Sequence, residues 1–295
     1  MINFFFQYVA NFCIKNNIKF FYKMFFFNFF KFFINKKIIL DFGLYKFFAY
    51  PQKKNLSRWM IRNLQIWDKE NIELILKIIK KKKSIFLDIG CNYGAYSIPI
   101  AKNYDDIDVY CFDPSENTIK KLEENIRLNN IQNITCFNIG IGEKEKYVFF
   151  DDNIENFKNS GSFQINNSNL GKKIKINSID NLINQNFIKP KKTIVVKMDI
   201  EGYEFYALQG LQETINKFDV IIFFEFSKKI IDNHINLEKD FLNFIESNTL
   251  NIYDKKLNKK NLHQLFIDIK KISKKHEVLE NFILTKKTIN KINDF

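Results

Sequence analysis

Short apolar runs alternate with amphipathic stretches from residue 84 onward. The apolar runs that indicate strands lie at 85–88, 107–113, 134–139, 193–199 and 220–226. Between them, apolar residues recur every three or four positions, which is typical of helices that pack one face against a sheet. The alternation predicts an α/β domain over residues 84–295, built on an open, mostly parallel sheet flanked by helices.

The same patterning locates other elements of the domain. Helices are predicted at 59–80, 115–129, 203–217 and 237–247, and further strands near residues 176, 251 and 282. Residues 151–171 are rich in Asn, Asp, Ser and Gly and lack periodicity, so a long loop or insertion is predicted there. Loops of this length often act as lids over a binding site.

Residues 1–83 follow a different pattern and are predicted to form a Phe-rich, largely helical N-terminal extension. Residues 1–50 contain 16 of the 34 phenylalanines. Lysines recur there every four residues, which on one helix would form a basic stripe: Lys15, Lys19 and Lys23. The longest charge-free stretch, residues 1–14, is shorter than the roughly 18 to 20 residues that a spanning helix needs. The extension is expected either to make peripheral membrane contact or to pack on the following domain or a second subunit.

Lysine supplies nearly all of the positive charge. The formal net charge is +13, and only three of the 46 basic residues are arginines. Proteins that read nucleic acids depend on the planar fork of arginine, so this composition argues against a nucleic-acid partner. Hydrophobic residues make up 46% of the chain and charged residues 27%, which excludes a disordered chain and a multi-span membrane protein.

The four cysteines and three histidines show no metal-binding or redox spacing. No Cys-x-x-Cys pair occurs, and the histidines stand far apart. No secretory signal precedes the cysteines. We therefore expect no metal site and a protein of the reducing cytoplasm, located at the inner membrane face if residues 1–50 contact lipid.

A turn with two glycines follows the first strand of the α/β domain. It reads Asp88-Ile-Gly90-Cys-Asn92-Tyr-Gly94. In an open α/β sheet this turn lies at the carboxyl edge, where glycines let backbone N–H groups approach a ligand closely. The spacing differs from the G-x-G-x-x-G of dinucleotide sites, which argues against a nicotinamide-dependent oxidoreductase. An ordinary tight turn is the alternative interpretation.

Asp113 ends the second strand and is followed by Pro114 and Ser115. A carboxylate at this position can accept hydrogen bonds from both hydroxyls of a ribose. Capping of the next helix is its alternative role. Asp88 adds a carboxylate that can anchor an ammonium group, so the two acids together fit a ligand with an amino-acid end and a nucleoside end. S-adenosylmethionine is such a molecule.

A third motif, K-M-D-I-E-G-Y-E at residues 197–204, ends the fourth predicted strand. The two-residue period of a strand places Lys197 and Asp199 on one face. Buried charges are unfavourable unless they are paired. The two residues therefore form either a structural ion pair or a group that holds or deprotonates an acceptor hydroxyl. Asp199 is the first candidate for the general base that would remove the proton of such a hydroxyl, Glu201 the second and His234 the third.

In this order, the three motifs resemble the FkbM family of S-adenosylmethionine-dependent O-methyltransferases, whose hallmark is a strand running into K-x-D-x-E-G-x-E. The resemblance covers about residues 84–226. It implies a class I methyltransferase-like (Rossmann-like) fold with S-adenosyl-L-methionine as cofactor. It also implies catalytic roles for three residues of the third motif: Lys197, Asp199 and Glu201.

The same resemblance implies which residues bind the cofactor. Those at the methionine end would be Asp88, Gly90, Asn92 and Gly94, with Asp113 at the ribose and Asn138 in the adenine region. Three positions depart from the family, among them Pro99, which lies early in the helix after the turn. Asp113 stands where a glutamate is more common, and Cys91 replaces a commoner alanine.

Members of this family methylate hydroxyls of sugars or of polyketide-like natural products, so the resemblance implies a small-molecule or glycan acceptor. We expect the hydroxyl of a sugar in a cell-surface glycan or glycolipid precursor. O-methylation of a polyketide-like or other small molecule is the alternative, as is a non-catalytic membrane-surface or interaction protein on the same fold. The sequence is compatible with an oligomer.

Overall fold

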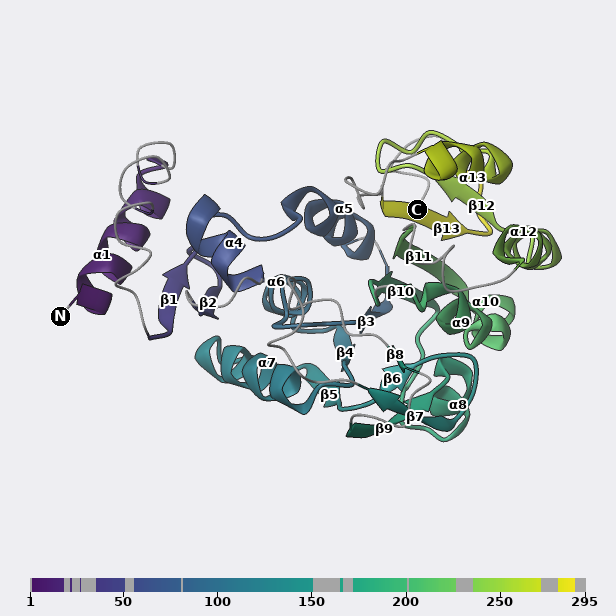
Figure 1. Cartoon of the computed structure of the whole chain (residues 1–295), viewed down its shortest axis with the longest axis horizontal. Coiled ribbons are helices and arrows are strands. Elements are labelled where there is room, and N and C mark those ends of the chain that lie inside the picture. Colours follow the sequence, from purple (N-terminus) through teal and green to yellow (C-terminus); the bar gives the residue numbers. More distant parts are fainter. Residues whose placement is uncertain are drawn as a thin grey trace.

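The computed structural model describes residues 2–18, 22, 27, 36–50, 56–80, 82–150, 165–166, 172–200, 202–226, 236–271 and 281–289. Its central sheet contains β3 (Ser84–Ile89), β4 (Asp108–Phe112), β5 (Ile134–Phe137), β10 (Thr193–Met198), β11 (Asp219–Glu225), β12 (Asn251–Tyr253) and β13 (Asn281–Thr285). These seven strands are hydrogen-bonded in the order β12-β13-β11-β10-β3-β4-β5 (Figure 1).

The strands from β11 to β5 run parallel to one another, and β13 runs antiparallel to both β11 and β12. Every residue of β3 and β10 is buried. Strands that are covered on both faces do not alternate polar and apolar side chains, which explains the continuous apolar runs in the sequence. The predicted α/β architecture, an open and mostly parallel sheet flanked by helices, is confirmed.

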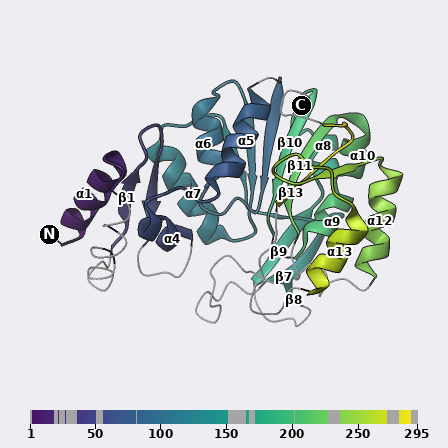
Figure 2. The ribbon, with the colours of Figure 1, turned by 90° about the horizontal axis from the view of Figure 1, so that it is seen from above.

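Two hydrophobic cores lie on opposite faces of the central sheet. One face is covered by α5 (Lys69–Ile79), α6 (Ser97–Asn103) and α7 (Glu116–Leu128). The other is covered by α8 (Ile179–Asn184), α9 (Glu204–Gln209), α10 (Gln212–Lys217), α12 (Leu237–Ser247) and α13 (Leu262–Lys271). Figure 2 shows these helices on either side of the strands. Within β3, Phe86 joins the first core while Ile85 and Leu87 join the second, as the alternation of strand side chains requires.

Two predicted helices are divided in the structure. The helix predicted at 203–217 consists of α9 and α10, which separate at Gly210 because the backbone there lies against Gly142. A Cβ at Gly210 would stand 2.0 Å from the carbonyl oxygen of Gly142. The helix predicted at 59–80 consists of α4 (Leu56–Asn63) and α5, with a left-handed residue, Asp68, just before α5. The prediction of single helices was therefore wrong in both places. Hydrophobic periodicity continues across both breaks, which is why that pattern does not reveal them.

A second, four-stranded sheet follows β5 and was predicted only in part. It contains β6 (Gly140–Ile141), β7 (Lys146–Phe150), β8 (Ile165–Asn166) and β9 (Lys172–Asn177), in the order β6-β9-β7-β8. Of these strands, the sequence predicted only β9. Most of the loop predicted at 151–171 lies outside the described residues, so its role as a lid stays a prediction.

The N-terminal extension contains a hairpin in addition to its helices. β1 (Ile38–Asp41) and β2 (Lys46–Ala49) pair antiparallel between α1 (Ile2–Lys15) and α7 (Figure 1). The amides of Lys46 and Phe48 donate to Asn129 Oδ1 (2.7 Å) and Asn125 Oδ1 (2.8 Å) of α7. Side-chain amides thus take the place of a neighbouring strand at the edge of β2. Apolar residues of the extension join the first core, so the extension packs directly on the α/β domain.

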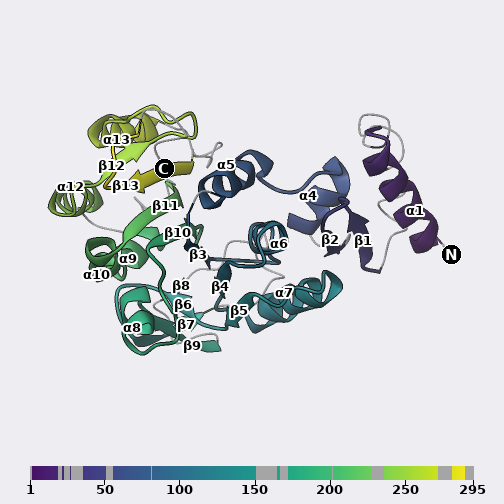
Figure 3. The ribbon, with the colours of Figure 1, turned by 180° about the vertical axis from the view of Figure 1, so that it is seen from behind.

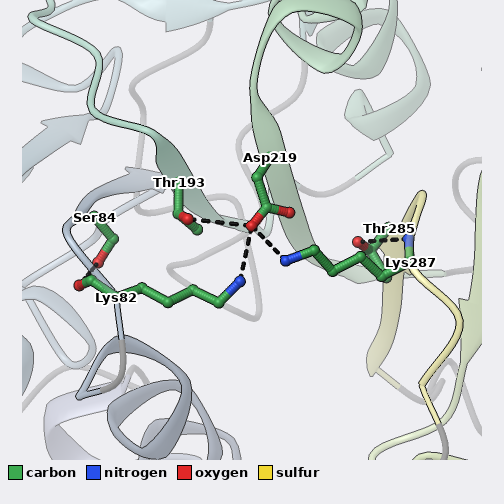
Figure 4. Close-up of polar contacts among 6 residues, drawn as sticks. All are labelled: Lys82, Ser84, Thr193, Asp219, Thr285 and Lys287. Atoms are coloured by element: carbon green, nitrogen blue, oxygen red, sulfur yellow. Dashed lines mark hydrogen bonds and ion pairs between the residues drawn. The ribbon is translucent and has the colours of Figure 1, made fainter. Parts of the chain in front are cut away.

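One carboxylate ties together the amino edge of the central sheet (Figure 4). Asp219, the first residue of β11, accepts hydrogen bonds at Oδ2 from Lys82 Nζ (2.8 Å), Lys287 Nζ (2.6 Å) and Thr193 Oγ1 (3.2 Å). Burial acts to raise the pKa of Asp219, but the hydrogen bonds from Lys287 and Lys82 outweigh it and hold the pKa below its ordinary value. The ionised carboxylate therefore joins the segment before β3, the strand β11 and the segment after β13.

We expect Asp219→Asn to lower the free energy of unfolding by about 1 to 3 kcal/mol at neutral pH, because two partly buried lysines lose their counter-charge. The folded pKa is depressed, so this contribution is present above the unfolded pKa and is lost as pH falls through the folded pKa. Urea unfolding at neutral and acidic pH measures the difference. Asp108→Asn, which removes the more exposed partner of Lys191, is the matched control and should have little effect. Equal losses in the two variants would contradict the assignment.

Candidate functional site

The carboxyl ends of β3 and β10 lie side by side, with Ile89 opposite Met198. From β3 the chain continues to β4 and β5 on one side of the sheet, whereas from β10 it continues to β11 on the other. Ligands of open α/β sheets bind in the crevice outside the strand ends at such a switch point. The three motifs identified in the sequence follow β3, β4 and β10, so all of them lie at this edge.

Gly90 allows the turn after β3 to touch the segment after β10. Its φ is +81°, and a Cβ added there would stand 1.9 Å from the carbonyl oxygen of Asp199. The amide of Asp199 donates to the carbonyl of Ile89 (3.0 Å). Gly94 has a φ of +87°, and a Cβ there would stand 2.6 Å from Leu122 Cδ1 of α7. The local backbone therefore requires glycine at both positions.

Asp88 is buried beneath this turn. Its carboxylate accepts a hydrogen bond from the hydroxyl of Ser97 in α6, and that hydroxyl oxygen accepts one from the thiol of Cys111 (3.0 Å). Burial raises the pKa of Asp88 to about 6, against the opposing effects of the Ser97 hydrogen bond and the charge of Lys197. In the structure Asp88 holds the start of α6, and its role in anchoring a ligand ammonium group stays a prediction.

Asp113, Asn92 and Asn138 lie together after the ends of β3, β4 and β5. Asp113 accepts hydrogen bonds from the amide of Asn92 at Oδ2 (3.3 Å) and from the amide of Ser115 at Oδ1 (2.9 Å). Asn138 donates from Nδ2 to the carbonyl of Asp113 (3.0 Å). The N-cap of α7 is Ser115, not Asp113, so the capping alternative for Asp113 is wrong. Asp113 instead fixes the amide of the cap residue. A carboxylate has about four acceptor positions, so this role is compatible with hydrogen bonds from ribose hydroxyls.

Lys197 and Asp199 form the ion pair that the sequence left open. Lys197 Nζ lies 3.4 Å from Asp199 Oδ2 and 5.1 Å from the ring centroid of Tyr96. The lysine side chain is 3% exposed and the aspartate side chain 34%. Burial acts to lower the pKa of Lys197, but nearby carboxylates outweigh it and the pKa is raised. These carboxylates are Asp199, Glu225, Asp68 and Asp88. Lys197 is thus an ammonium ion at neutral pH and cannot take up a proton.

Asp68 and Tyr96 extend this site toward the N-terminal extension and were not predicted. The Tyr96 hydroxyl donates to Asp68 Oδ2, which also accepts from Nδ2 of Asn71 (2.8 Å) and of Asn281 (3.4 Å). Asn281 lies opposite Glu225 at the end of β11. These contacts hold the break between α4 and α5 against the carboxyl edge of the sheet. Asp68 directly precedes α5, and an aspartate at that N-cap position is the signal that could have located the break.

Glu204 fixes the segment that carries Asp199. Its buried carboxylate accepts hydrogen bonds from the amides of Ile200 (2.9 Å) and Gly202 (2.8 Å). Burial raises the pKa of Glu204 to about 7, although backbone hydrogen bonds act in the opposite direction. The last glutamate of the third motif, to which the sequence assigned no role, is therefore a positioning residue.

Two of the predicted candidates for the base, Glu201 and His234, lie outside the described residues. In the part of the chain that the structure describes, no group of three or more His, Cys, Asp or Glu side chains could hold a metal ion. All four cysteines are free thiols. Among the residues placed here, Asp199 is thus the partly exposed carboxylate that the third motif brings to the switch point.

Comparison with known proteins gives a family match and distant structural ones. A family model described as methyltransferase FkbM domain matches residues 88–249. The methyltransferase FkbM of Methylobacillus flagellatus KT has a TM-score of 0.40 and 18% identity, over 68% of this chain and 43% of that one. This chain thus spans less than half the length of that protein. The M. jannaschii protein TYW2, solved in complex with AdoMet, has a TM-score of 0.41 and 14% identity, over 84% of each chain. No curated protein matches.

Proposed function

Because the chain belongs to the FkbM methyltransferase family, we propose that it transfers the methyl group of S-adenosylmethionine to a hydroxyl group. The observation that supports this most directly is the meeting of the Asp88–Gly94 turn, Asp113 and the Lys197–Asp199 pair at one switch point. This edge combines acceptors for a nucleoside, a close backbone approach and a partly exposed carboxylate.

The polar groups at the ends of β3, β4 and β5 suit the methyl donor. Asp113 accepts the ribose hydroxyls, Asn138 lies in the adenine region, and the Asp88–Gly94 turn lets the backbone approach the methionine end. S-adenosylmethionine supplies a methyl group on a sulfonium, which is already a good leaving group. The protein therefore chiefly positions the acceptor and excludes water.

Asp199 is the proposed proton acceptor. As the acceptor oxygen forms its bond to the methyl carbon, the bond from that carbon to sulfur breaks and the hydroxyl proton passes to the Asp199 carboxylate. The buried ammonium of Lys197, 3.4 Å away, favours the ionised form of this carboxylate and orients it. Lys197 thus acts through Asp199, and Glu201 is the second candidate for the proton acceptor.

The acceptor in this proposal is a sugar hydroxyl of a cell-surface glycan or glycolipid precursor. Asp199 and Glu225 are partly exposed at the acceptor side of the switch point. Sugar hydroxyls donate hydrogen bonds that such carboxylates accept, whereas an apolar acceptor would desolvate them without compensation. Free thiols at all four cysteines suit a reducing cytoplasm, where we place the reaction.

Transfer of tritium from methyl-labelled S-adenosylmethionine to glycans of the cells that produce the protein tests this proposal. We expect label in a saccharide, and we expect it to survive mild alkali, because a methyl ether is stable there and a methyl ester is hydrolysed. Heat-denatured protein is the control. Label that is confined to non-saccharide material or released by alkali would contradict the proposed acceptor.

Replacing Asp113 by Ala should raise the Kd for S-adenosylmethionine by about 10- to 100-fold, because a hydrogen bond to a charged acceptor contributes about 1.5 to 3 kcal/mol. Titration calorimetry on the full chain measures it. The matched control is Ser115→Ala, which removes the hydroxyl that caps α7 and leaves the carboxylate in place. This control should lower stability with little change in Kd. An unchanged Kd in Asp113→Ala would overturn the ribose assignment.

A further inference from the structure

Helix α1 has two apolar faces, of which only one is packed. Phe6 and Ala10 are fully buried against the rest of the extension. On another face, Phe4 is 77% exposed, Tyr8 64% and Phe12 50%. Residues four apart lie on the same side of a helix, so these three rings form one stripe, called here the aromatic stripe. Large aromatic side chains in such a row are unusual on a water-facing surface.

The hydrogen bonds between α1 and β1 fix the direction in which the aromatic stripe points. Gln7 Oε1 accepts from the amide of Ile39 (2.8 Å), and Asn11 Nδ2 donates to the carbonyl of Ile39 (3.1 Å). Asn11 Oδ1 accepts from the amide of Asp41 (3.0 Å). These three bonds hold the edge of β1, so α1 cannot roll to bury the stripe without breaking them. Figures 1 and 3 show α1 at one end of the molecule, away from α12 and α13.

The sequence that contains the stripe is basic up to residue 40. Residues 1–40 contain six lysines and no aspartate, glutamate or arginine. Lys15 lies in the last turn of α1 and is exposed. Of the predicted basic stripe, Lys19 and Lys23 lie outside the described residues. Two copies of this chain meeting through α1 would bring like charges together, whereas an anionic surface would complement them.

We propose that α1 docks on a bilayer surface rich in anionic lipid, with the aromatic stripe in the interface and Lys15, in the last turn of the helix, near the headgroups. Aromatic rings on a fixed helix face, next to lysines, are the features of an interfacial helix. No helix in the described ranges is both long and apolar enough to cross a bilayer. This docking goes beyond the proposed methyl transfer and does not depend on it.

Vesicle co-sedimentation of the full chain tests the docking. Vesicles of phosphatidylcholine with phosphatidylglycerol should bind the protein, vesicles of phosphatidylcholine alone should bind it far less, and salt should weaken binding. The variant Phe4→Ser/Tyr8→Ser/Phe12→Ser should lower the partition coefficient at least about tenfold. The matched control, Leu44→Ser/Tyr147→Ser/Phe187→Ser, changes side chains that are 52%, 60% and 56% exposed elsewhere and should bind like wild type.

Near-ultraviolet circular dichroism and the Kd for S-adenosylmethionine show that each variant is folded. Vesicle binding by the stripe variant that equals wild type, or binding that does not depend on phosphatidylglycerol, would overturn the proposal. Light scattering that shows a dimer for wild type and the control variant but a monomer for the stripe variant would also overturn the proposal. That result would assign the stripe to contact with a second copy of the chain.

Discussion

Replacing Asp199 by Asn should lower kcat by about 10²- to 10⁴-fold, the range that a positioned general base contributes. Asparagine keeps the shape of the side chain but cannot take up the proton of the acceptor hydroxyl. The Kd for S-adenosylmethionine should change less than about threefold, because Asp199 acts on the acceptor and Asp113 on the donor. Steady-state methyl transfer from labelled donor measures kcat, and calorimetry measures Kd.

Glu143→Gln is the matched control for this experiment. Glu143 pairs with Lys146 (3.2 Å) beside β7, and its side chain is 29% exposed, close to the value for Asp199. It should turn over like wild type. Full turnover by Asp199→Asn would show that the acceptor proton leaves by another route, and Glu201 would be the next residue to test.

Much of the fold could be predicted because strands that are buried on both faces appear in the sequence as continuous apolar runs. The strands β3, β10 and β11 are almost wholly apolar since helices cover both sides of the sheet. The break at Gly210 could not be predicted, because contact with Gly142 imposes it. At Asp68 the continuing hydrophobic periodicity outweighed the N-cap-like signal. The hairpin β1–β2 was missed for a related reason: its short Phe-containing strands look like the surrounding Phe-rich segment, and side chains of α1 and α7 complete its edges.

The candidate site likewise contains some residues that could be located from the sequence and others that could not. The acids and glycines that end β3, β4 and β10 could be located because each follows directly on an apolar run at the carboxyl edge. Asp68, Tyr96 and Asn281 could not, because they meet only in the folded chain. Asp68 and Asn281 are 213 residues apart in sequence. Sequence reasoning thus finds side chains placed by a strand end and misses those brought in by packing between distant segments.

Lys197→Met should lower the free energy of unfolding by about 3 to 5 kcal/mol at neutral pH, the usual effect of removing one partner from buried charges. Methionine fills a similar volume, so the loss is electrostatic. The ammonium group is buried among Asp199, Glu225, Asp68 and Asp88, and without it these carboxylates lose their counter-charge. Urea unfolding across pH measures the effect. Lys191→Met, at a more exposed ion pair, is the control and should change stability little.

The pH dependence separates this electrostatic role from packing. In the folded protein the pKa of Asp88 is raised from its ordinary value of 3.8 to about 6. Ionisation of Asp88 therefore destabilises the folded state as pH rises from about 3.8 through 6. Lys197 acts to lower the pKa of Asp88, so removing Lys197 raises that pKa further and extends the range of this pH effect upward. The difference in the free energy of unfolding between wild type and Lys197→Met should therefore be largest at neutral pH. It should decrease as pH falls, because Asp88 becomes protonated in both proteins. Adding Asp88→Asn to Lys197→Met should recover part of the stability, since it removes a carboxylate that has lost its partner. A loss that is the same at every pH and is not recovered by Asp88→Asn would mean that Lys197 acts through packing alone.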